Sequence, residues 1–131
     1  MRRHLFIWIG GAIGAVARWR LSGALAPHAA FPVGIFVVNL SGCLALGFLQ
    51  TYALEAQWSP ELRLGVTTGF LGAYTTFSTW QEGVMLLGRH GDPGLAALYL
   101  VASLAGGLVM AAAGMAGARW LLSGTAADTA R

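Results

Sequence analysis

The sequence predicts an all-α integral membrane protein that forms a single domain over residues 1–131. Composition is the first observation: 56% of the residues are hydrophobic and 10% are charged, whereas a soluble domain carries roughly 25% charged residues. The second is that 8 cationic and 5 acidic side chains are too few to cover a soluble surface. These observations exclude a soluble enzyme, a disordered chain and a protein that binds nucleic acid through a basic patch.

Long uncharged stretches predict four transmembrane helices, because a helix needs about 20 apolar residues to cross a bilayer. Residues 29–54, 64–81 and 93–118 contain no charged side chain. The first span is less uniform, since Arg18 and Arg20 interrupt it. We expect helices over about 4–26, 33–54, 62–88 and 94–122.

Local signals support these boundaries and suggest close packing. Ser59 is a suitable helix N-cap with Pro60 at the first helical position, and Asp92 with Pro93 repeats this arrangement before the fourth span. Small residues spaced four apart allow helix backbones to approach closely in lipid. Two such pairs occur, Gly10 with Gly14 and Gly65 with Gly69.

The first span has a second interpretation as a signal peptide. Two arginines at 2–3 precede an apolar stretch and the small-residue segment 24–26. Arg18 and Arg20 lie close to that cleavage site and fit a signal peptide poorly. We therefore expect a retained helix, which makes the protein multi-pass and leaves function inside the bundle or at its contact with a second copy.

The distribution of arginine sets membrane orientation only weakly. Five arginines fall on the side that holds both termini, and three fall on the other. Such a chain is able to insert in both orientations, which permits an antiparallel dimer, while one fixed orientation remains the alternative. The five are Arg2, Arg3, Arg63, Arg119 and Arg131, and the three are Arg18, Arg20 and Arg89.

The third span is unusually polar near its centre, where residues 72–80 include four threonine and serine side chains. Unpaired polar groups in hydrocarbon cost several kcal/mol, so such a run predicts an interrupted helix. Carbonyls freed at a break are able to hold a cation, and freed N–H groups are able to face an anion. The alternative is a continuous helix whose hydroxyls bond to its own backbone.

Further polar and aromatic groups lie at membrane depth. Asn39 and Cys43 share a face of the second span, and Tyr99 and Ser103 share a face of the fourth. An asparagine there commonly joins helices, and an aromatic pair is commonly packing. Ring edges are nevertheless electropositive, so amide, hydroxyl and ring-edge groups together favour a path for a small anion. The third span supplies Thr76, Phe77, Thr79 and Trp80 to this path.

Two charged residues lie within or beside the spans. Arg18 is about two-thirds along the first helix and is able to attract anions to a pore mouth or to extend to the membrane surface. Glu82 follows the aromatic pair and is a candidate for helix pairing, for a proton relay or for an interfacial position.

Three segments together resemble the CrcB/Fluc family of fluoride channels. They are residues 10–18, residues 31–34 leading to residues 38–42, and residues 69–79, with Glu82 following. The segment from Gly-Phe-Leu-Gly to Thr-Thr-Phe-Ser-Thr is the most specific of them. The resemblance implies an antiparallel, dual-topology homodimer in the inner (plasma) membrane, with two pores that export fluoride passively and reduce its toxicity.

The resemblance also implies roles for individual residues. Asn39 would donate to fluoride, and Phe77 would present its ring edge to the pore beside Trp80, Thr76 and Thr79. Tyr99 and Ser103 match a polar track of the family's fourth helix. The main-chain carbonyls of Gly72 and Thr75 would bind one structural sodium ion at the dimer centre.

Two residues depart from the family pattern. Trp80 stands where phenylalanine is usual, and Ile35 stands where threonine is common. Tryptophan is bulkier and adds an N–H donor, and isoleucine removes a hydroxyl. Both changes affect the expected width and polarity of the path.

Other function classes fit less well. A small dual-topology, proton-coupled multidrug exporter needs a membrane-embedded carboxylate in its first helix, and this first span has arginine instead. A structural adaptor protein would not explain the polar centre of the third span. We expect no enzymatic activity, because no acid–base pair or nucleophile with a base is evident.

Overall fold

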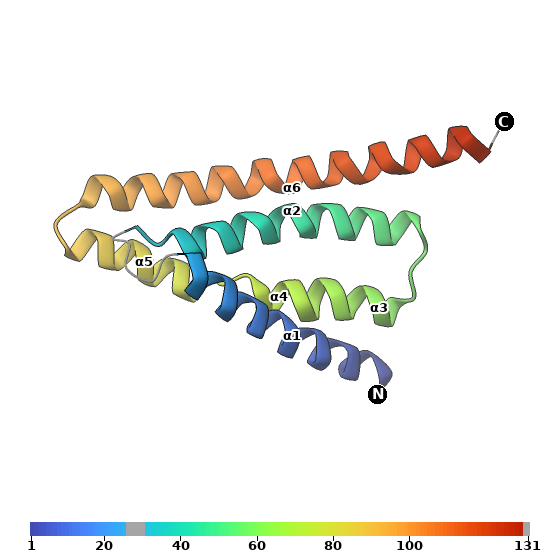
Figure 1. Cartoon of the computed structure of the whole chain (residues 1–131), viewed down its shortest axis with the longest axis horizontal. Coiled ribbons are helices and arrows are strands. Elements are labelled where there is room, and N and C mark those ends of the chain that lie inside the picture. The colour runs from blue at the N-terminus through green and yellow to red at the C-terminus, as the bar shows by residue number, and fades with distance from the viewer. Residues whose placement is uncertain (26–30, 130–131) are drawn as a thin grey trace.

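The computed structural model describes residues 1–25 and 31–129, with side chains as far as Gly124, and this part of the chain is all helical (Figure 1). Three helices are long and continuous, whereas the third predicted span is divided into four short pieces. The long helices are α1 (Arg2–Leu25), α2 (Val33–Glu55) and α6 (Pro93–Thr129). The pieces are α3 (Pro60–Leu64), the π-helix η1 (Gly65–Leu71), α4 (Gly72–Tyr74) and α5 (Ser78–Arg89).

The observed helices agree with the four predicted spans to within a few residues at most ends, and α6 continues further. The predicted caps are confirmed, because Ser59 Oγ accepts a hydrogen bond of 3.4 Å from the backbone N–H of Leu62. Asp92 Oδ1 accepts one of 2.9 Å from the N–H of Leu95. Residue 26, where the first span and the candidate cleavage site were expected to end, lies outside the described residues.

Glycines bring α1 into backbone contact with the third span. The pair Gly10 and Gly14 faces η1, so that a Cβ at Gly14 would overlap the carbonyl of Phe70 and one at Gly10 would overlap the carbonyl of Gly65. The two small-residue pairs therefore pack against each other, as close helix packing in lipid requires. Figure 1 shows α1 running obliquely along the α3–α4 side of the bundle.

A second close contact joins α2 to α6, which run side by side in Figure 1. A Cβ at Gly47 would overlap the carbonyl of Ala111, and a Cβ at Gly114 would overlap the carbonyl of Leu44. The turn from α5 into α6 depends on Gly91, whose φ of 87° suits glycine. These contacts form the scaffold around the broken third span.

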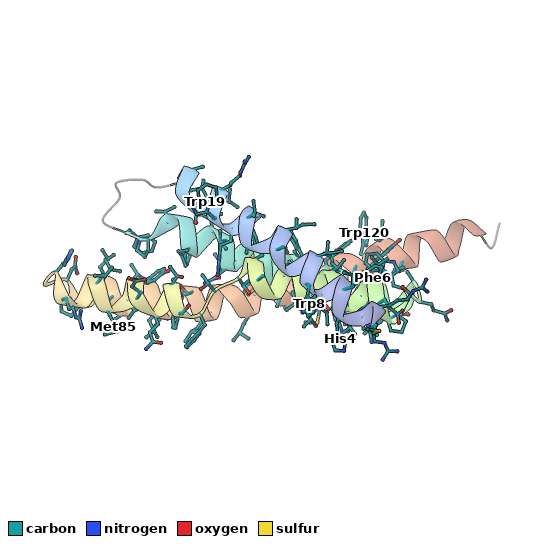
Figure 2. The ribbon with its side chains drawn as sticks, turned by 90° about the horizontal axis from the view of Figure 1, so that it is seen from below. His4, Phe6, Trp8, Trp19, Met85 and Trp120 are labelled. Atoms are coloured by element: carbon teal, nitrogen blue, oxygen red, sulfur yellow. The ribbon has the colours of Figure 1, made fainter. Side chains whose placement is uncertain are left out.

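Two helices are individually long and apolar enough to cross a membrane, α2 and residues 93–124 of α6. Helix α1 carries four arginines, and the third span is interrupted, which explains why neither meets that test alone. Large apolar side chains point outward from the bundle (Figure 2), as an environment of lipid or a partner subunit requires. Among them are Trp8, Trp19 and Trp120, each more than 70% exposed.

Candidate functional site

The third span is interrupted at residues 75–77, between α4 and α5, as the sequence predicted. Thr75 adopts an extended conformation with φ −78° and ψ 156°. Its backbone N–H and its hydroxyl both donate to the carbonyl of Leu71, each over 3.0 Å. These bonds end α4 on its last turn, and α5 begins again at Ser78.

Asn39 of α2 holds the interrupted backbone in place. Its Nδ2 donates to the carbonyl of Thr76 over 3.0 Å, and the N–H of Thr76 donates to its Oδ1 over 2.9 Å. The side-chain amide thus satisfies a peptide group that helical hydrogen bonding leaves unpaired, where an unpaired group is costly. A primary amide has two N–H groups, so Asn39 retains one donor for another acceptor.

The hydroxyl of Thr76 starts α5. It accepts a hydrogen bond of 3.3 Å from the backbone N–H of Thr79 and donates to Thr79 Oγ1 over 3.1 Å. The Ser78 hydroxyl lies 3.3 Å from the hydroxyl oxygen of Thr76. Thr76 is 7% exposed, so its hydroxyl acts as a buried cap.

Two further residues attach the break to α2, and the sequence did not single them out. Ser41 Oγ and the Tyr74 hydroxyl share a hydrogen bond of 2.9 Å, and Ser41 also donates to the carbonyl of Val38 over 3.0 Å. Gly42 leaves room for Thr75, because a Cβ there would overlap the threonine methyl group. Ser41 and Gly42 follow Asn39 closely, within residues 38–42, and Tyr74 lies within residues 69–79. Their places in these two segments were the available signal.

The carbonyls of Gly72 and Thr75 have lost their helical partners. A continuous helix would direct the N–H groups of Thr76 and Thr79 to them, but these N–H groups donate to Asn39 Oδ1 and Thr76 Oγ1 instead. Both residues border the same pocket. Free carbonyl oxygens of this kind suit a hard monovalent cation, so the predicted pair fits sodium by the chemistry of its donors.

The break opens onto a pocket of about 310 Å³ that brings together seven of the predicted site residues. Among the described residues that line it, none has a charged side chain. Phe77 stands at this pocket with 71% of its surface exposed, 5.2 Å from Trp80 between ring centroids at an interplanar angle of 42°. The seven are Asn39, Gly72, Thr75, Thr76, Phe77, Trp80 and Ser103, and the lining is completed by Gly42, Cys43, Leu46, Thr67, Leu71 and Leu104.

Four predicted residues lie outside this lining. Thr79 reaches the site only through Thr76. Tyr99 is fully buried against Trp80, although Ser103 on the same face borders the pocket and donates to the Tyr99 carbonyl over 2.6 Å. Arg18 is half-buried on α1 and Glu82 is exposed on α5, so their roles remain predictions.

The family model described as "CrcB-like protein, Camphor Resistance (CrcB)" matches residues 5–115. This chain belongs to the CrcB family. It is 47% identical over 126 residues to fluoride-specific ion channel FluC 1 of Moorella thermoacetica, covering 94% of this chain and 90% of that protein. It is 39% identical to FluC of Acidobacterium capsulatum, covering 86% and 93%. It is 42% identical to FluC 2 of Geobacillus kaustophilus, covering 88% and 92%.

Both departures of this CrcB chain from the family pattern lie at one place. Trp80 is 9% exposed and packs with Leu87, Ala96 and Tyr99. Ile35 contacts the same cluster from α2. The sequence identified the two positions separately, whereas their contact depends on how α2, α5 and α6 pack.

Proposed function

We propose that this CrcB chain is a fluoride-selective passive channel of the inner membrane that exports fluoride from the cytoplasm. The observation that carries the proposal is the uncharged pocket at the helix break, lined by an amide, hydroxyls and aromatic rings. Conduction requires sites that an ion enters readily and leaves easily. A pocket with donors but no fixed cation meets that requirement, and the names of the relatives agree with it.

Two kinds of group line the proposed pore: hydrogen-bond donors and the edges of aromatic rings. Two hydrogen bonds to the Thr76 backbone already hold the Asn39 side chain in one orientation. Its remaining N–H is therefore able to bind an ion without a further loss of side-chain entropy. Phe77 offers an electropositive ring edge that replaces part of the water shell of the ion. Thr76, Thr79, Ser103, Trp80 and Tyr99 continue the polar and aromatic path, with Arg18 at its mouth and Glu82 in helix pairing.

The functional unit is an antiparallel homodimer of dual topology, which has two pores. A single subunit leaves the Phe77 ring 71% exposed beside an open pocket. A large exposed aromatic at a pocket is typical of a surface that a partner covers. The weak arginine bias of the sequence, five against three, permits the two opposite insertions.

A structural sodium ion at the dimer centre is bound by the carbonyls of Gly72 and Thr75 from both subunits. The supporting observation is that both carbonyls lack their helical N–H partners. Sodium neutralises the partial negative charge of these oxygens and fixes the two broken helices relative to each other.

Fluoride efflux from liposomes tests the channel. Wild-type protein is expected to release fluoride and retain chloride, with no requirement for a proton gradient. Drug exchange driven by protons would instead support a multidrug exporter, although α1 contains no carboxylate for that chemistry. Removal of sodium is expected to abolish flux, and unchanged flux with no bound monovalent cation would overturn the sodium proposal alone.

The ring-edge role is tested by Phe77→Ile, with Leu46→Ile as the matched control in the same pocket. Phe77→Ile is expected to reduce fluoride flux to background while each subunit stays folded, because the exposed ring contributes little to the fold of a subunit. Leu46→Ile is expected to conduct normally. Undiminished flux in Phe77→Ile would refute the role.

A further inference from the structure

Helix α2 contacts three consecutive residues at the point where the third span is interrupted. Gly42 faces Thr75, since a Cβ there would overlap the Thr75 methyl group and would lie 3.3 Å from Cδ1 of the Tyr74 ring. Ser41 bonds to the residue before Thr75, and Asn39 bonds to the residue after it. The interrupted backbone is therefore attached to α2 on both sides of Thr75.

The side chain of Tyr74 is held at both its ring and its hydroxyl. The ring stacks on Phe70, one turn earlier, with centroids 5.8 Å apart and an interplanar angle of 8°. Ser41 donates its proton to the Val38 carbonyl over 3.0 Å, and a hydroxyl has only one O–H group. The tyrosine is therefore the donor in the bond of 2.9 Å between Tyr74 and Ser41. The ring stack and this bond together fix the end of α4.

This attachment lies apart from the proposed fluoride path. Neither Ser41 nor Tyr74 is among the described residues that line the pocket at the break. Ser41 is also on a different face of α2 from Asn39, because two residues correspond to a rotation of about 200° along a helix. These positions favour a role that acts through the backbone over direct contact with fluoride.

The backbone held by Tyr74 carries the two free carbonyls. Helix α4 has only three residues, Gly72–Tyr74, so its direction depends on what holds its end. A continuous helix would pair the Gly72 carbonyl with the N–H of Thr76 and leave this oxygen unavailable to a cation. Attachment to α2 opposes that rearrangement, because the extended residue Thr75 then lies between two fixed neighbours.

We propose that Tyr74 and Ser41 are positioning residues for the sodium ion, and that their bond keeps the carbonyls of Gly72 and Thr75 available to it. This inference rests on the proposed sodium site and names side chains that determine its affinity. Tyr74→Phe removes the bond and keeps the ring that stacks on Phe70. Ser41→Ala removes the same bond from the side of α2.

Sodium binding is measured by isothermal titration calorimetry of the full-length protein in detergent, in a sodium-free buffer of N-methyl-D-glucamine chloride. Tyr74→Phe is expected to raise the dissociation constant for sodium roughly fivefold, the effect of one lost hydrogen bond. Ser41→Ala should do the same, and the double variant no more than either, because the two side chains share one bond. Ser41→Thr should bind sodium as the wild type does, since it keeps the hydroxyl and its methyl group has room in the hollow between α2 and α6 that Ser41 borders.

Two controls match these changes. Tyr52→Phe removes a tyrosine hydroxyl near the end of α2, where the ring stacks on Phe48 away from the break. Ser22→Ala removes a serine that donates to its own helix, at the Trp19 carbonyl. Neither control is expected to change the dissociation constant for sodium.

A purely structural role gives a different result. Tyr74→Phe would then lower the thermal midpoint without sodium and leave the dissociation constant unchanged, which would overturn the inference. Fluoride flux at saturating sodium is a second readout, and the half-saturating fluoride concentration is expected to stay the same because the Asn39 bonds remain. A changed fluoride requirement would assign the pair to the fluoride path and overturn the inference.

The proposed sodium site and this inference fail in different ways. A wild-type protein that binds no sodium would overturn the sodium site, and the inference with it. Normal sodium binding by the wild type, with unchanged dissociation constants in Tyr74→Phe and Ser41→Ala, would overturn the inference alone.

Discussion

Helix α2 meets two of its neighbours, α6 and the broken third span, by opposite means. Against α6 it is joined through glycine, where Gly47 and Gly114 bring the backbones into direct contact. Against the broken third span it is joined through polar side chains, where Asn39 and Ser41 bond to Thr76 and Tyr74. The first contact needs no donors, whereas the second exists because backbone groups were left without partners.

This difference separates the scaffold from the site. In lipid, close backbone approach stabilises helix pairs through packing, and the pairs tolerate little change because carbonyl groups occupy the space of the missing side chains. The polar contact stabilises an interrupted helix and at the same time leaves the carbonyls of Gly72 and Thr75 free. Substitutions in the first region should therefore affect folding, and those in the second should affect transport as well.

The largest expected effect is on the glycine contact. Gly47→Ala would place a methyl group on the carbonyl of Ala111 and separate α2 from α6, at a cost of about 3 kcal/mol in the free energy of unfolding. The measurements are the monodisperse yield in detergent and the thermal midpoint. Gly88→Ala on α5 is the matched control, since a Cβ there meets nothing within 4 Å. Equal midpoints would contradict the role of the glycine.

The second effect breaks the polar contact. Asn39→Asp keeps an acceptor for the N–H of Thr76 but loses the donor to its carbonyl and places a negative charge in the pocket. We expect a loss of about 1–3 kcal/mol in stability, faster hydrogen exchange at the Thr76 amide and weaker fluoride flux. Gln50→Glu, on the same helix, provides the control for added charge. Unchanged rates in Asn39→Asp would count against the pore assignment.

A smaller effect on stability is expected within the polar region, from the loss of the Thr76 hydroxyl. Thr76→Val removes the hydroxyl that caps α5 while it leaves the backbone bonds to Asn39 in place. The expected cost is about 1 kcal/mol, and Thr76→Ser is expected to restore most of it. Thr68→Val, at an exposed position of η1, is the comparison. Equal thermal midpoints for the two valine variants would show that the cap has no energetic role.

The smallest effect concerns a third kind of contact, the exposed ion pair of Arg3 and Glu61 at 3.3 Å. The backbone N–H at the start of α3, and then Arg3, hold the pKa of Glu61 below its usual value. This stabilisation is present above the ordinary pKa of the carboxyl group and is lost as the pH falls through the lowered one. Glu61→Gln should remove a slight acid dependence of the thermal midpoint and nothing else.

The sequence predicted the fold well because its signals are local. Uncharged length, caps at Ser59 and Asp92, and the glycine pairs each depend on neighbours along the chain. The break was predictable for the same reason, since four hydroxyl residues within 72–80 are unusual in one apolar helix.

The site was predicted less completely, because its contacts cross between helices. Asn39 was identified as a donor to an ion, but its bond to the Thr76 backbone depends on how α2 packs beside the interruption between α4 and α5. Tyr99 and Ser103 share a face, yet only Ser103 borders the pocket, since Trp80 and Phe31 enclose the tyrosine. The π-helix over 65–71 packs against α1, and no pattern in the sequence predicted its π geometry.

The length of α6 has a practical consequence for orientation. Its 37 residues extend about 55 Å, against a hydrocarbon thickness of roughly 30 Å, and its end projects past the other helices in Figure 1. Ser123 lies exposed in the last turns of α6. A cysteine at that position, with Cys43→Ser, would report from intact cells which fraction of the molecules faces outward. Labelling at the end of α6 would thus measure the fraction of molecules that are inserted in each direction.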